Sequence, residues 1–65
     1  MTLNERSYLL NILEKYSDRK DLWDLTDRIT DAQRKRFLAL YFNHKTDELK
    51  EMLENVIAFQ SIITN

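Results

Sequence analysis

The chain has 65 residues, of which 43% are hydrophobic and 32% are charged, and its formal net charge is −1. This composition is too apolar for a disordered chain, and the charge gives no overall attraction to nucleic acid or to an anionic membrane. The absence of cysteine excludes disulfides and thiolate metal sites, and a single histidine leaves no cluster for zinc, so no cofactor is expected.

Glycine and proline are also absent. Tight hairpin turns depend on glycine, whereas helices tolerate its absence, so we expect one all-α domain over residues 1–65. A core of this size rarely supplies more than about 3–5 kcal/mol, which favours added stability from a second copy or a partner chain. The sequence shows neither a signal peptide nor an apolar run long enough to span a membrane, and this favours a cytoplasmic location.

Helix starts are marked by capping patterns. Thr2 with Glu5, and Thr30 with Gln33, each match a capping box, in which two side chains bond reciprocally to backbone N–H groups. Thr46 precedes two acidic residues and is predicted to cap the last helix. These patterns place helix starts near residues 2, 30 and 46.

Apolar periodicity completes the predicted elements. The first helix runs to about Ser17, and a short second helix over residues 18–29 is capped by Ser17 or Asp18. The third helix ends at Asn43, which is expected to take the left-handed conformation in place of glycine. Because the connections are short, we predict a small three- to four-helix bundle with three main antiparallel helices and the short second helix bridging the first and third.

Charge is sorted along the chain. Residues 21–31 and 46–65 are mainly acidic, whereas residues 32–45 contain four basic residues and no acidic one. Opposite charges on adjacent helices favour antiparallel pairing, although each exposed pair contributes less than about 1 kcal/mol.

The apolar residues of the last helix cover more than half of its circumference, whereas a helix that packs only against its own bundle needs one apolar face. Two interpretations are open: the helix is central in the monomer, or it also pairs with a second copy. Gln60 is a lone polar residue in this arc, of the kind that fixes register in helical assemblies. The predicted dimer interface consists of Met52, Val56, Phe59, Gln60 and Ile63.

Trp23 lies about 100° from the apolar stripe of its own helix. Tryptophan is enriched at binding hot spots, but in a small domain it also serves as a core side chain, and both interpretations are open. In the first interpretation it protrudes toward a partner together with Tyr16 and Leu22. The predicted protein-binding residues are Trp23, Tyr16, Leu22, Phe59, Ile62 and Ile63.

The sequence contains no group of residues suited to catalysis. His44 is the only imidazole and lies in a turn, and no glycine loop can hold a phosphate. Glu51 with Glu54, or Asp47 with His44, has the spacing of a metal site, but such pairs are common on exposed helix faces. We therefore expect neither an enzyme nor a metal site.

A DNA-binding alternative comes from the third and fourth helices, which superficially resemble a helix–turn–helix. In that motif the start of the second helix enters the major groove, and here Asp47 and Glu48 would repel phosphates. Arg34, Lys35 and Arg36 are the residues through which a small transcriptional regulator would contact DNA.

These observations predict a small non-enzymatic helical module that binds a larger protein, as its regulator or inhibitor, and that forms a homodimer. No motif is specific enough to indicate a family. The small size and lack of catalytic chemistry are typical of helical regulators, including many encoded by phages and mobile elements.

Overall fold

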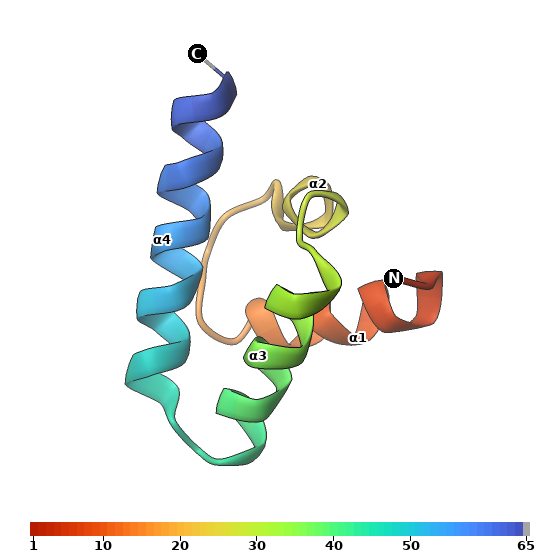
Figure 1. Cartoon of the computed structure of the whole chain (residues 1–65), viewed down its shortest axis with the longest axis vertical. Helices are drawn as coiled ribbons and strands as arrows, with labels where there is room; N and C mark the ends of the chain where they lie inside the picture. The colour runs from red at the N-terminus through yellow and green to blue at the C-terminus, as the bar shows by residue number, and fades with distance from the viewer. Residues whose placement is uncertain (65) are drawn as a thin grey trace.

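The computed structural model describes the backbone of residues 1–64 and the side chains of residues 1–60. Its described part is all-helical, as predicted, with α1 (Leu3–Leu13), α2 (Leu22–Asp27), α3 (Asp31–Phe42) and α4 (Thr46–Thr64). The helices α3 and α4 run in opposite directions and diverge from the turn that joins them, while α1 runs crosswise to α4 (Figure 1). None of the described helices has both the length and the apolar character needed to cross a membrane.

Two of the predicted helix starts are confirmed in atomic detail. The Thr2 hydroxyl accepts a hydrogen bond from the Glu5 backbone N–H (3.1 Å), and the Glu5 carboxylate accepts one from the Thr2 N–H (2.7 Å). Thr30 and Gln33 form the same reciprocal pair at 3.1 and 2.9 Å. Such a box satisfies two backbone donors that have no partner within the helix, and therefore fixes where α1 and α3 begin.

The turn between α3 and α4 differs from the prediction by one residue. Asn43 has φ −92° and its side-chain amide donates to the Ala39 carbonyl (2.7 Å), while the left-handed position falls on His44 (φ 57°). The expectation that Asn43 is left-handed is therefore wrong. The cap of α4 is also displaced, since Thr46 is the first helical residue and the Lys45 carbonyl accepts the hydrogen bond from the Leu49 N–H (3.0 Å).

The segment between α1 and α2 is less helical than predicted. The helix α1 ends at Leu13 rather than near Ser17, and α2 begins at Leu22 rather than at residue 18. Arg19 binds both carboxylate oxygens of Asp21 at 2.8 and 2.7 Å, and its backbone N–H donates to the Ser17 hydroxyl. These contacts hold the loop in a non-helical path, and neither Ser17 nor Asp18 caps α2, whose cap position is occupied by Asp21.

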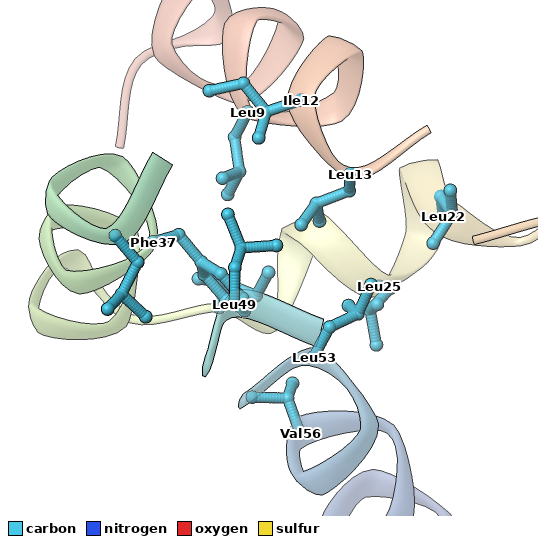
Figure 2. Close-up of a cluster of buried hydrophobic side chains, with 11 residues drawn as sticks. Leu9, Ile12, Leu13, Leu22, Leu25, Phe37, Leu49, Leu53 and Val56 are labelled. Atoms are coloured by element: carbon cyan, nitrogen blue, oxygen red, sulfur yellow. The ribbon is translucent and has the colours of Figure 1, made fainter. Parts of the chain in front are cut away.

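The core draws on every helix (Figure 2). Phe37 is fully buried, and burial of one such side chain contributes about 1.5–3 kcal/mol. The helix α2 packs against α1, and α3 packs against both α1 and α4. The buried apolar residues are Leu9, Ile12, Leu13, Leu22, Leu25, Ile29, Phe37, Leu40, Leu49, Leu53 and Val56.

Candidate protein-binding surface

The wide apolar arc of α4 is divided between the core and the surface. Met52 and Ile57 are half-buried against the core, whereas the Phe59 side chain is 61% exposed. Within residues 46–60 the bundle therefore covers most of the arc but leaves its large aromatic residue exposed. The side chains of Ile62 and Ile63 lie outside the described residues. The residues of the arc that are buried in the core are Leu49, Leu53 and Val56.

We define the α4 flank as Glu48, Met52, Asn55 and Phe59. Their spacing of four, three and four residues places them within about 60° of one another around the helix. A hollow of about 240 Å³ lies beside Met52, and another of about 160 Å³ lies beside Phe59. The first is lined by Arg36, Glu48, Glu51, Met52 and Asn55, and the second by Arg28, Thr30, Gln33, Val56, Phe59 and Gln60.

The hollow beside Phe59 combines an apolar floor with one cation. The Thr30 hydroxyl and the Gln33 carbonyl oxygen are already engaged in the capping box. Arg28 is exposed, and within residues 1–60 no ion pair involves its guanidinium. A group that brings an apolar side chain and a carboxylate would match both features of this hollow.

Two predicted interface residues lie toward the interior of the bundle rather than on the α4 flank. Val56 is buried and forms only the floor of the hollow. Gln60 of α4 is half-buried. Its side chain lines a hollow of about 270 Å³ beside α2, together with Arg19 and Arg28. Gln60 therefore faces its own chain, because it projects close to the buried Leu49 around α4. Its role in setting a dimer register stays a prediction.

The second predicted patch is not assembled as expected. Leu22 is 2% exposed in the core, so the expectation that it protrudes toward a partner is wrong. Tyr16 is half-buried and packs against the same core. Trp23 is 37% exposed, and the Arg6 guanidinium carbon lies 3.8 Å from the centre of its ring. Leu22 is the first residue of α2 and shares the buried face of that helix with Leu25. The Leu22 side chain therefore points into the core, and Trp23 is left at the surface without it.

The sequence does not predict the polar network that joins α1 and α2. The fully buried Thr26 hydroxyl donates to the Trp23 carbonyl (2.6 Å) and accepts from Arg6 Nε (2.8 Å). Arg6 Nη2 donates to the same carbonyl (2.6 Å), and Nη1 lies 3.6 Å from the Asp27 carboxylate. The only signal in the sequence is the position of Thr26, four residues after Leu22, on the buried face of α2.

A further exposed aromatic residue lies away from the α4 flank. Phe42 at the end of α3 is 60% exposed and meets the Tyr41 ring edge-on, with 5.6 Å between the ring centres. The Tyr41 hydroxyl and Lys15 Nζ are 2.7 Å apart, and this hydrogen bond raises the pKa of Lys15. Exposure alone therefore does not distinguish Phe59 from Phe42; the adjacent hollow does.

The basic cluster of the DNA-binding alternative is divided by the fold. Arg34 lies 3.0 Å from the Glu5 carboxylate of α1 and has a side chain only 13% exposed, whereas Lys35 and Arg36 are exposed. Consecutive residues on a helix project about 100° apart, so the three cations do not form one patch. Arg34 therefore pairs with α1, whereas Lys45 forms only a local ion pair with Glu48, three residues later (3.7 Å).

The part of the chain that the structure describes contains no cluster of side chains that could bind a metal ion. No three of the residue types His, Cys, Asp and Glu lie together there. The hydrogen bond from Arg19 lowers the pKa of Asp21, while the Thr2 backbone N–H and then the Thr2 hydroxyl lower the pKa of Glu5. Both carboxylates are thus occupied by structural contacts.

A scan against protein-family models, a search of curated proteins and a search of solved structures each found no match. The function proposed below therefore rests on the residues of this chain alone.

Proposed function

We propose that this chain is a small non-enzymatic protein-binding module that regulates or inhibits a larger protein, with the α4 flank as its binding surface. The observation that carries this proposal is the 61% exposure of Phe59 beside a hollow with an apolar floor. Burying a phenylalanine side chain contributes about 1.5–3 kcal/mol, and aromatic residues seated in pockets dominate many interfaces. Because Phe59 is already partly covered, a partner that buries its exposed 61% gains part of this free energy.

The position of the flank also supports the proposal. Glu48, Asn55 and Phe59 are exposed and Met52 is half-buried, so the flank is accessible to a second molecule. Trp23 is a second contact in this proposal, through the part of its ring that Arg6 leaves open. A homodimer and a cytoplasmic location, both expected from the sequence, remain part of the proposal.

The test is affinity capture from lysate of the producing cells with two matched variants. Phe59→Asp and Phe42→Asp introduce the same charge at side chains that are 61% and 60% exposed. We expect wild type and Phe42→Asp to retain the same larger protein, and Phe59→Asp to lose it, with all three equally helical by circular dichroism. Retention by Phe59→Asp, or selective loss by Phe42→Asp, would refute the proposed surface.

A further inference from the structure

The α4 flank carries matching features at its two ends, and we infer that it binds a second copy of this chain, antiparallel, about a two-fold axis beside Asn55. This inference rests on the proposed function, because the second copy occupies the surface that the larger protein covers, so the two partners compete for it. It adds the orientation of the two helices and the residues that meet.

The spacing of the apolar residues fits a two-fold axis. Met52 and Phe59 are seven residues apart on one flank, a distance of about 10 Å along the helix. A two-fold axis that is perpendicular to α4 and passes halfway between Met52 and Phe59 exchanges the positions of these two residues. Met52 of each copy then meets Phe59 of the other. A two-fold interface needs such self-complementarity, and contact between a thioether and an aromatic ring is favourable.

The charges favour the antiparallel orientation over the parallel one. The Phe59 end carries Arg28, whereas the Met52 end carries the carboxylates Glu48 and Glu51 against the single guanidinium of Arg36. Antiparallel pairing brings Arg28 of each copy toward the acidic end of the other, while parallel pairing sets like charges together. Within each copy Glu48 is already 3.7 Å from Lys45, which leaves Glu51 to meet Arg28 of the second copy.

The residue nearest the axis is polar. Asn55 is exposed and lies between the two hollows. Its amide has both donors and an acceptor, so two copies of Asn55 facing each other across the axis can bond reciprocally. A polar residue at such a position fixes register in helical pairs, the role first expected for Gln60.

A charge exchange tests this orientation. Arg28→Glu and Glu51→Arg are examined by sedimentation, each alone and then mixed in equal amounts, and native mass spectrometry identifies the mixed dimer by its mass. Each variant alone sets like charges together twice, and we expect its dimerisation to weaken about tenfold or more. The mixture restores both opposite-charge contacts and returns the affinity to near that of wild type.

Lys35→Glu is the matched control, because it makes the same charge change as Arg28→Glu on an exposed residue of α3 away from the flank. We expect it to dimerise like wild type. A mixture no tighter than its components would overturn the antiparallel pairing. A wild type that stays monomeric at high micromolar concentration would overturn the second copy as occupant. In either case, Phe59-dependent capture of a larger protein would leave the proposed function standing.

Discussion

Replacing Thr26 by valine isolates the polar contact between α1 and α2. Valine has nearly the shape of threonine but has no hydroxyl, so the substitution removes two hydrogen bonds and leaves no large cavity. The lost contacts are the bond donated to the Trp23 carbonyl (2.6 Å) and the bond accepted from Arg6 Nε (2.8 Å). The Trp23 carbonyl keeps its bond from Arg6 Nη2, whereas Arg6 Nε loses its hydrogen-bond acceptor.

The expected loss follows from the type of each bond. A neutral hydrogen bond contributes about 1 kcal/mol and one to a charged group about 1.5–3 kcal/mol, while the added apolar methyl group offsets part of this. We therefore expect the free energy of unfolding to fall by about 2 kcal/mol. In a domain of this size that is a large share of a total near 3–5 kcal/mol. It corresponds to a fall in melting temperature of roughly 8–16 °C.

The assay is urea unfolding followed by Trp23 fluorescence and by circular dichroism. Protein concentration is held fixed, because pairing of copies would make the midpoint depend on it. Thr26→Ser is the control: it keeps the hydroxyl and loses one buried methyl group, at a cost of about 1 kcal/mol. A valine variant as stable as wild type, or more stable than the serine variant, would show that this network does not hold α2 against α1.

Three further outcomes are expected. Phe37→Ala removes the largest fully buried side chain and costs about 3–5 kcal/mol, so the variant should show no cooperative thermal transition by circular dichroism. His44→Gly removes the steric cost of a left-handed residue that has a Cβ (φ 57°) and should raise the free energy of unfolding by about 1 kcal/mol, seen as a higher urea midpoint. An unchanged or lower midpoint contradicts this. The Thr2 backbone N–H and hydroxyl lower the pKa of Glu5 in the folded state, so its stabilisation is complete above the unfolded value, about pH 4.3, and is lost as pH falls through the lower folded value. Glu5→Gln should flatten the acid dependence of the urea midpoint, and an unaltered pH profile would argue against this account.

The features predicted correctly are those that depend on neighbours in the sequence. Thr2 and Thr30 cap helices through residues three positions away, and the pattern of apolar residues identifies α3 and α4. The rule that Asn can replace glycine at the left-handed position after a helix places that position at Asn43, one residue too early. The sequence does not indicate that the Asn43 amide bonds back to Ala39, or that the left-handed position falls on His44.

The features missed depend on residues that are distant in the chain. Arg6 and Thr26 are 20 positions apart, and their hydrogen bond exists only because α2 packs across α1. The same packing decides which residues of α2 are covered, so that Leu22 is buried and Trp23 stays at the surface. For the α4 flank, the apolar arc predicted exposed apolar surface that included Phe59 and Val56, but only the fold shows that Phe59 is exposed and Val56 is buried.

The most direct measurement of the central claim, association through the α4 flank, is sedimentation equilibrium of wild type beside the two matched phenylalanine variants. We predict that wild type and Phe42→Asp associate with equal affinity and that Phe59→Asp stays monomeric over the same concentration range. Equal association by Phe59→Asp, or its loss in Phe42→Asp alone, would contradict a binding surface centred on Phe59.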